Sequence, residues 1–111
     1  MSSLAPSATL ESYDPATNAW TVRAPMPTPR SGAVGVVING LLYVVGGSGN
    51  GGPPLNTMVV YTPGSNTWQS VSLMPTNRTW LTAGAIKGVL YAVGGHNFQA
   101  AYLGTTEAYL P

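Results

Sequence analysis

The sequence contains no cysteine, and this absence excludes disulfide bonds, thiolate metal ligands and cysteine nucleophiles while leaving the redox compartment open. Charged residues are also scarce: they make up 6% of the chain, where an ordinary soluble domain has roughly 25%. The formal net charge of +1 does not provide the basic surface that nucleic acid or an anionic membrane requires. We therefore expect neither of these as a partner.

Long apolar runs are missing as well. The longest, at residues 34–38 and 41–45, are far shorter than the roughly 20 residues of a membrane-spanning helix. Residues 1–6 have neither the basic region nor the apolar core of a secretory signal. We expect no membrane association, and the compartment stays open between the cytoplasm and export.

What the chain does contain is 14 glycines and 10 prolines among its 111 residues. These residues interrupt long regular elements, because proline removes a backbone donor and glycine favours turns. A helical bundle is therefore disfavoured, and short strands joined by turns are expected.

The sequence repeats itself at an offset of 48 residues without a gap. Tyrosine, tryptophan, arginine and glycine positions coincide at this offset. The aligned sets are Tyr13, Tyr61 and Tyr109; Trp20 and Trp68; Arg30 and Arg78; Tyr43 and Tyr91; Gly46 and Gly94; and Gly47 and Gly95. So many coincident residues indicate an internal duplication, which decides the fold class before any single element does.

Within one period the pattern predicts four strands. Residues 32–38 form a nearly continuous apolar run, which is typical of a strand buried on both faces. The Asn39-Gly40 pair then favours a tight type I′ hairpin turn into a second strand. The predicted strands are residues 32–38, 41–45, 58–61 and 68–72 in one copy and residues 81–86, 89–93 and 106–109 in the next.

These features resemble the kelch repeat. Gly46 and Gly47 end the second strand, Tyr43 stands three residues before them, Tyr61 lies in the third strand, and Trp68 opens the fourth. A Met-x-x-x-Arg segment leads into the first strand, and the resemblance extends from about residue 9 to residue 111. It implies an all-β fold in which each repeat is a four-stranded antiparallel blade of a propeller, with the first strand innermost.

The chain then contains two blades, arranged as two partial blades around a complete one. Residues of about 9–31 supply third and fourth strands, residues 32–79 a complete blade, and residues 80–111 the first three strands of another. Closed propellers have about four to eight blades. We expect further copies of the chain to complete the ring, with a six-bladed homotrimer favoured over an eight-bladed tetramer or an open filament. The alternative is that the chain is a fragment of a longer kelch protein.

One copy of the third strand, at residues 9–13 or 105–109, is surplus to two complete blades. We expect the N-terminal segment of one chain to complete the blade that the C-terminal segment of a neighbouring chain begins. Trp20 and Trp68, at the start of the fourth strands, are expected to pack between blades.

Arg30 and Arg78 immediately precede the first strand of each repeat. The resemblance implies that the matching arginine often lies at the rim of a central pocket, where a guanidinium group could bind a carboxylate or another anion of a ligand. The alternative is structural, with each arginine donating hydrogen bonds to carbonyl groups of an adjacent loop. Both alternatives stay open at this point.

Aromatic residues near these arginines are further candidates for ligand contact. Trp80 replaces Gly32 of the other copy, and an exposed ring beside an arginine would suit a sugar or a peptide, although a buried filling role is equally plausible. Phe98 and Tyr102 belong to the loop of residues 96–103, and long loops on a rigid scaffold often carry recognition.

Enzymatic functions have little support in the sequence. His96 is the single histidine, and a lone histidine at a strand end is more often a loop hydrogen-bonding group than a base or metal ligand. Glu11, Asp14 and Glu107 all fall in third strands or their turns, which we expect to lie away from the pocket. The sequence therefore predicts no catalytic residue, no metal and no cofactor.

The resulting prediction is a non-catalytic binding or scaffolding module that recognises a protein, a peptide or a glycan. A purely structural ring or filament unit is the alternative. A fold alone does not choose between these functions, because function depends on sites placed on the fold.

Overall fold

A computed structural model of the chain describes residues 5–50, 52–97 and 102–111. The regular elements of this part are all strands. They are β1 (Leu10–Asp14), β2 (Ala19–Arg23), β3 (Val34–Ile38), β4 (Leu41–Val45), β5 (Met58–Thr62), β6 (Thr67–Val71), β7 (Thr82–Ile86), β8 (Val89–Val93) and β9 (Thr106–Tyr109). None of the described residues forms a helix that is long and apolar enough to cross a membrane.

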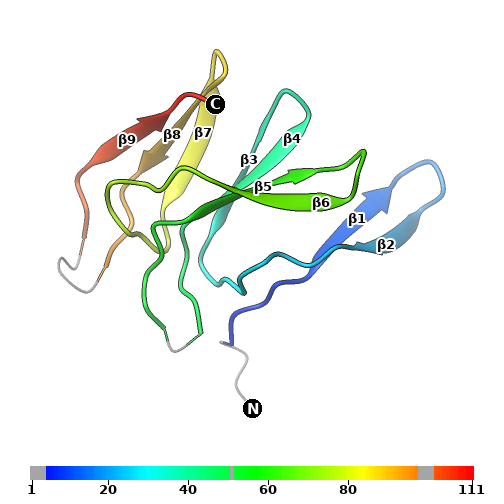
Figure 1. Cartoon of the computed structure of the whole chain (residues 1–111), viewed down its shortest axis with the longest axis horizontal. Helices are drawn as coiled ribbons and strands as arrows, with labels where there is room; N and C mark the ends of the chain where they lie inside the picture. The colour runs from blue at the N-terminus through cyan, green and yellow to red at the C-terminus, as the bar shows by residue number, and fades with distance from the viewer. Residues whose placement is uncertain (1–4, 51, 98–101) are drawn as a thin grey trace.

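The strands form three antiparallel sheets, which lie one after another from one side of the molecule to the other (Figure 1). Their strand orders are β1-β2, β3-β4-β5-β6 and β7-β8-β9. The predicted all-β class is confirmed, and the sheets are consistent with kelch blades. The strand predicted at 32–38 begins only at Val34, because Gly32 has a φ of +68° and Ser31 pairs with Ser48 in a separate bridge.

The 48-residue repeat is reproduced in the strand register. Tyr61 of β5 lies opposite Trp68 of β6, and Tyr13 of β1 lies opposite Trp20 of β2. The ring centroids are 5.1 Å apart in both pairs. Equivalent residues of the sequence therefore make equivalent cross-strand contacts, so each sheet can serve as an internal reference for the others.

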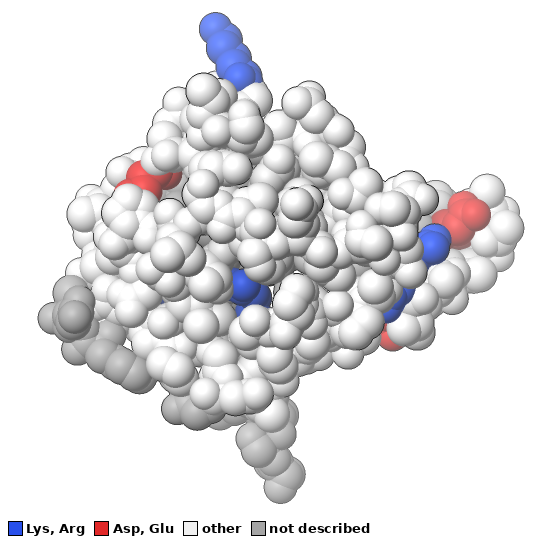
Figure 2. Space-filling view, viewed as in Figure 1, with Lys and Arg blue, Asp and Glu red and all other residues white. Residues whose placement is uncertain are grey.

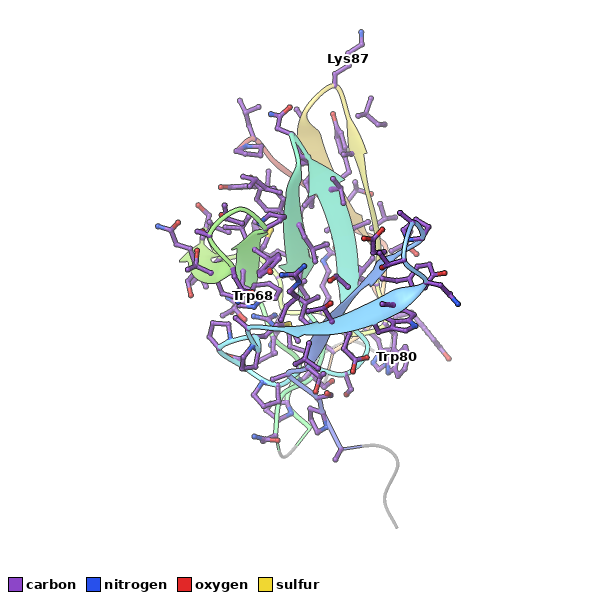
Figure 3. All side chains as sticks on the ribbon, turned by 90° about the vertical axis from the view of Figure 1, so that its right-hand side faces the viewer. Trp68, Trp80 and Lys87 are labelled. Carbon is purple, nitrogen blue, oxygen red and sulfur yellow. The ribbon has the colours of Figure 1, made fainter. Side chains whose placement is uncertain are left out.

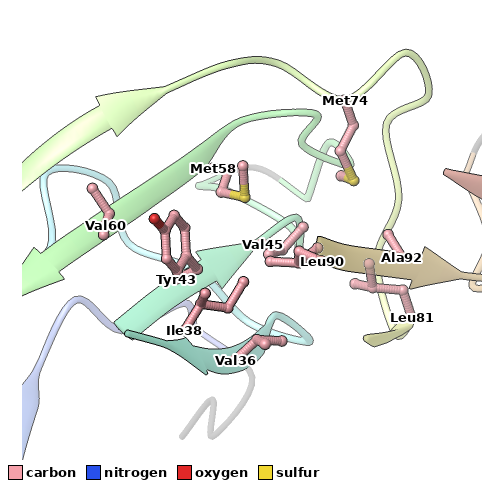
Figure 4. Packing of buried hydrophobic residues seen from close by; sticks show 10 residues of the cluster. All are labelled: Val36, Ile38, Tyr43, Val45, Met58, Val60, Met74, Leu81, Leu90 and Ala92. Atoms are coloured by element: carbon pink, nitrogen blue, oxygen red, sulfur yellow. The ribbon is translucent and has the colours of Figure 1, made fainter. Parts of the chain in front are cut away.

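The hydrophobic core lies between the four-stranded sheet and the three-stranded sheet. Side chains from β3, β4 and β5 face Leu90 and Ala92 of β8, and Met74 and Leu81 from the connection between the sheets close one end (Figure 4). The core residues are Val36, Ile38, Tyr43, Val45, Met58, Val60, Met74, Leu81, Leu90 and Ala92. Each large side chain buried there stabilises the fold by about 1.5–3 kcal/mol.

The two tight hairpins β3-β4 and β7-β8 have different residues at the first position of the turn. Asn39 and Gly40 have φ values of +52° and +77°, and Lys87 and Gly88 have φ values of +51° and +78°. This backbone is that of a type I′ turn, which favours Asn-Gly. Lysine has no short polar side chain to offset the left-handed conformation.

Lys87→Asn is therefore expected to raise the free energy of unfolding by about 0.5–1 kcal/mol. The reverse change, Asn39→Lys, is expected to lower it by a similar amount. Thermal unfolding of both variants measures the effect. A lower melting temperature for Lys87→Asn would contradict this account of the turn.

Candidate functional site

The connections between sheets and the long connections within sheets gather at one end of the molecule, hereafter the loop end (Figure 1). This end comprises residues 24–33, 46–57, 72–81 and 94–105, of which residues 51 and 98–101 lie outside the described part. Isolated β-bridges tie these connections together. The bridged pairs are Ser31 with Ser48, Ser48 with Pro54, Leu55 with Arg78, and Thr79 with His96.

Arg30 lies inside the loop end and is 5% exposed. Its Nη1 donates to the carbonyl oxygens of Gly46 at 2.8 Å and Thr57 at 3.0 Å, and its Nη2 donates to the Thr57 hydroxyl at 2.9 Å. Burial lowers the pKa of Arg30 from its ordinary value, because desolvation disfavours the charged form. The guanidinium thus ties the end of β4 to the start of β5.

Arg78 makes the same contacts in the next repeat and is fully buried. Its Nη1 donates to the carbonyls of Gly94 at 2.8 Å and Thr105 at 2.9 Å, and its Nη2 donates to the Thr105 hydroxyl at 2.8 Å. In addition, Nη2 lies 3.1 Å from Glu107 Oε1. The other carboxylate oxygen of Glu107 accepts a hydrogen bond of 2.6 Å from Thr76.

In the single chain, both guanidinium groups donate to backbone carbonyls of adjacent connections, and neither is exposed at a rim. This arrangement matches the structural alternative, in which the arginines stabilise the loops instead of binding a ligand. A contact between Glu107 and Arg78 was not predicted from the sequence. Glu107 pairs with Ala92 across the β8-β9 ladder, and this register brings its carboxylate to Arg78. Val59 occupies the matching place beside Arg30, so Arg30 has no equivalent carboxylate.

Trp80 stands apart from the other aromatic residues of this end. It is 68% exposed, and its φ is +56°, close to the +68° of Gly32 at the same place in the other repeat. Its backbone N–H donates to the Gly32 carbonyl at 2.9 Å. A Cβ built on Gly32 would lie 3.0 Å from the indole ring, so the ring lies directly against that glycine. The left-handed conformation costs a residue with a side chain about 1–2 kcal/mol.

Figure 3 places Trp80 toward the loop end and Lys87 at the tip of the β7-β8 hairpin. Tyr102 also belongs to the loop end and is 87% exposed. Phe98, the remaining aromatic candidate, lies outside the described residues.

The two tryptophans of the fourth strands differ from each other. Trp68 donates a hydrogen bond of 2.8 Å from Nε1 to the carbonyl of Ala24, in the connection that follows β2. It therefore joins one sheet to the segment leading out of the sheet before it. Trp20 is 68% exposed and touches Tyr13 on its own two-stranded sheet.

His96 and Asn97 are positioned by Asn77 and Thr79 on the neighbouring connection. The backbones of Thr79 and His96 exchange two hydrogen bonds of 3.1 Å. The Asn97 amide donates to the carbonyl and side-chain oxygens of Asn77, and this pair was not predicted from the sequence. A signal was present, because Asn77, Trp80 and Asn97 replace Pro29, Gly32 and Gly49 of the other repeat. The two repeats thus differ at three positions of the loop end.

The loop end carries no exposed Lys, Arg, Asp or Glu among the residues that the structure describes. Most of the face in Figure 2 is likewise formed by uncharged residues. A pocket of about 50 Å³ lies between the sheets, where Ser72, Leu73 and Tyr109 contribute to its wall. Ligand pockets for drug-sized molecules measure about 300–1,000 Å³, so this one has room only for a few water molecules.

No three His, Asp or Glu side chains of the described part lie close enough together to bind a metal ion. The chemical resources of the loop end are therefore exposed aromatic rings, hydroxyl and amide groups and backbone amides. These groups suit surface recognition of an uncharged ligand, through stacking and hydrogen bonds.

Comparison with known proteins identifies a kelch motif at residues 29–75. The chain is 50% identical over 42 residues to Kelch-like ECH-associated protein 1B of Danio rerio, a match that covers 38% of this chain and 7% of that protein. It is 55% identical over 40 residues to the Influenza virus NS1A-binding protein homolog of Mus musculus, covering 36% of this chain and 6% of that protein. The matched segment therefore spans less than a tenth of either relative.

Proposed function

From the kelch motif that this chain carries, we infer that the chain is a non-catalytic binding unit of a β-propeller, and we propose that its loop end contacts the ligand. Kelch repeats generally build propellers that bind proteins. One relative is by its name a homolog of an influenza virus NS1A-binding protein, and that name supports a protein-binding function for this chain.

The observation that carries the proposal is Trp80. A bulky ring that is 68% exposed gains little from burial, yet this residue adopts a backbone conformation for which the other repeat has glycine. Strained residues with this profile concentrate at binding sites, because the surrounding structure maintains them for function rather than for stability. The exposed ring of Trp80 offers a ligand a large aromatic contact surface.

The chemistry of the loop end limits the classes of ligand that it could bind. Arg30 and Arg78 are buried and already donate to carbonyl groups, so they do not offer a charged contact to an anion. The exposed aromatic side chains that the loop end offers to a ligand are therefore Trp80 and Tyr102. A protein loop, a peptide or a glycan that is uncharged at the point of contact fits this surface, since aromatic rings stack on sugars and on apolar side chains.

The propeller itself needs more blades than one chain supplies. We propose that copies of this chain supply them, three chains giving six blades, with four chains and eight blades as the other closed form. A longer polypeptide that contributes the remaining blades is the alternative. In either case the loop ends of successive repeats would line one mouth of the ring.

Trp80→Gly tests the binding function. We expect the variant to lose binding at least tenfold to whichever ligand the wild-type protein selects from arrays of oligosaccharides and peptides, because a central aromatic contact accounts for at least about 1.4 kcal/mol. Its stability should change by less than about 1 kcal/mol, because relief of strain offsets the greater freedom of glycine in the unfolded chain.

The matched control is Lys87→Asn, which also changes a residue at positive φ but at the opposite end of the molecule. This variant should bind as the wild type does. Unchanged binding by Trp80→Gly, or no binding by the wild-type protein to either array, would contradict the proposal and favour a purely structural unit.

A further inference from the structure

The first and last strands of the chain, β1 and β9, are two copies of the same third strand of the repeat. Residues 9–15 and 105–111 share threonine, glutamate, tyrosine and proline at matching places. The middle copy, at residues 57–63, shares the threonine, tyrosine and proline but has Val59 where the other two have Glu11 and Glu107. Of the positions at which both end copies differ from the middle copy, this is the one at which they have the same residue.

The shared residues of β9 are those that bind Arg78. Thr105 accepts hydrogen bonds from the guanidinium through its carbonyl and its hydroxyl, and Glu107 forms the ion pair. Thr9 and Glu11 are the corresponding residues of β1. Glu11 is exposed, and within the part of the chain that the structure describes its carboxylate has no ion pair. The strand β1 thus carries an Arg78-binding sequence without an arginine.

The two end sheets are complementary in their missing strands. The sheet β7-β8-β9 has no fourth strand among the described residues, and the sheet β1-β2 has only a third and a fourth strand. The order β7-β8 followed by β1-β2 would reproduce the complete sheet β3-β4-β5-β6. Within one chain these two sheets lie on opposite sides of the central sheet (Figure 1), so in an assembly of copies each would complete the other between two chains.

Burial of equivalent residues supports the same conclusion. Tyr61 is 5% exposed in the complete sheet, whereas Tyr13 is 44% exposed in the two-stranded sheet. On the three-stranded sheet, Ile86 is 64% exposed and Val93 is 43% exposed, while their equivalents in the complete sheet, Ile38 and Val45, are core residues. The end sheets therefore expose the apolar side chains that a neighbouring blade covers in the middle of the chain.

We propose that β1 of one copy replaces β9 in a second copy, where Thr9 and Glu11 bind Arg78, and that β2 then becomes the missing fourth strand. This inference rests on the proposed assembly of copies but is independent of ligand binding at Trp80. The arginine exchanges one threonine and one glutamate for another pair at the same places, so the exchange itself is nearly neutral in energy. The additional strand and the covered apolar faces provide the net stabilisation.

Trp20 gains a specific partner in this arrangement. Trp68 donates to the carbonyl of Ala24, and Ser72 is the residue one repeat after Ala24. In the exchanged sheet, Trp20 of the first copy would donate to the carbonyl of Ser72 in the second copy, at the edge of the small pocket that Ser72 helps to line. The exposed indole of the free chain would then become a contact between two chains.

Cysteine pairs distinguish the two possible neighbours of β8, because the natural chain has no cysteine. Val93 lies opposite Thr106 in β9, and Leu10 is the residue of β1 that matches Thr106. Residues opposite each other in antiparallel strands have Cα atoms about 4.5–5.5 Å apart, which a disulfide can span. The test variant is therefore L10C with V93C, and the matched control is V93C with T106C.

Under mild oxidation, we expect the L10C/V93C protein to migrate as covalent multimers on a non-reducing gel. The V93C/T106C protein should stay a single chain and retain free thiols, because β9 is displaced. Monomeric L10C/V93C together with oxidised thiols in V93C/T106C would overturn the exchange.

Light scattering on the wild-type protein separates this result from the other proposals. A species of about three chain masses, each of 11.5 kDa, together with the L10C/V93C cross-link supports the exchange. An oligomer without that cross-link overturns the exchange alone. A monomer at every concentration overturns both the assembly and the exchange, whereas loop-end binding is tested separately by Trp80→Gly.

Discussion

Arg78→Ala is expected to lower the free energy of unfolding by about 3–5 kcal/mol, enough to leave a small domain largely unfolded. The guanidinium is fully buried, donates to Gly94 and Thr105, and forms an ion pair with the carboxylate of Glu107. Removing it leaves a carboxylate that is only 15% exposed without a cation, and the Gly94 carbonyl loses its guanidinium donor. Urea unfolding followed by circular dichroism measures the loss.

Arg30→Ala is the matched control, because the repeat places it in the same hydrogen bonds without a carboxylate. Its expected cost is about 1–3 kcal/mol, because the Gly46 carbonyl loses its guanidinium donor, whereas the Thr57 carbonyl still accepts from the Gly46 N–H. A double variant, Arg78→Met with Glu107→Leu, removes both charges and should recover part of the loss. Equal destabilisation by Arg78→Ala and Arg30→Ala would show that the ion pair with Glu107 adds nothing to stability.

This comparison also shows what the sequence could and could not predict. The strands 41–45 and 89–93 were predicted with the bounds that the structure has, because a hairpin turn and a glycine doublet limit them locally. The strand 106–109 was also predicted with its observed bounds, and it lies one repeat after the predicted strand 58–61. The contact between Arg78 and Glu107 was missed. It depends on the register of β9 against β8 and on the path of the connection before β7, which no local pattern specifies.

Trp80 was recognised from the sequence as a departure from the repeat, but its conformation was not. The other repeat has glycine there, and a glycine allows many backbone conformations, so its presence did not reveal that a positive φ is required. The structure shows that Trp80 adopts the conformation of Gly32 and stacks against it. The replacement of a glycine by tryptophan at a position with positive φ was therefore a stronger indication of a functional residue than either residue alone.

Substitution of the first glycine of a doublet is expected to have the second large effect on the free energy of unfolding. Gly46 has a φ of +67°, and a Cβ there would lie 2.7 Å from the backbone carbonyl oxygen of Arg78 and 3.2 Å from Leu81. Gly94, its equivalent, has a φ of +69°, but the nearest atom to its Cβ would be 3.7 Å away. The two positions share the same backbone conformation and differ in crowding, because the next connection along the chain approaches Gly46 alone.

Gly46→Ala is expected to destabilise the chain by at least about 3 kcal/mol, because the clash with backbone adds to the conformational cost. Gly94→Ala should show only the conformational cost of about 1–2 kcal/mol. Thermal unfolding of both variants at low protein concentration measures the difference, and equal losses would contradict the crowding argument.

Repeating the comparison of Gly46→Ala and Gly94→Ala at higher protein concentration tests whether copies of the chain assemble through the loop end. In a ring of copies, the connection that carries Arg30 in the next chain would approach Gly94 as the Arg78 connection approaches Gly46, since Arg30 and Arg78 are equivalent in the repeat. The free energies of unfolding of the two variants should therefore become more similar at protein concentrations where the wild-type protein is oligomeric. A difference that stays constant at concentrations where the wild-type protein is oligomeric would mean that the copies do not join through the loop end.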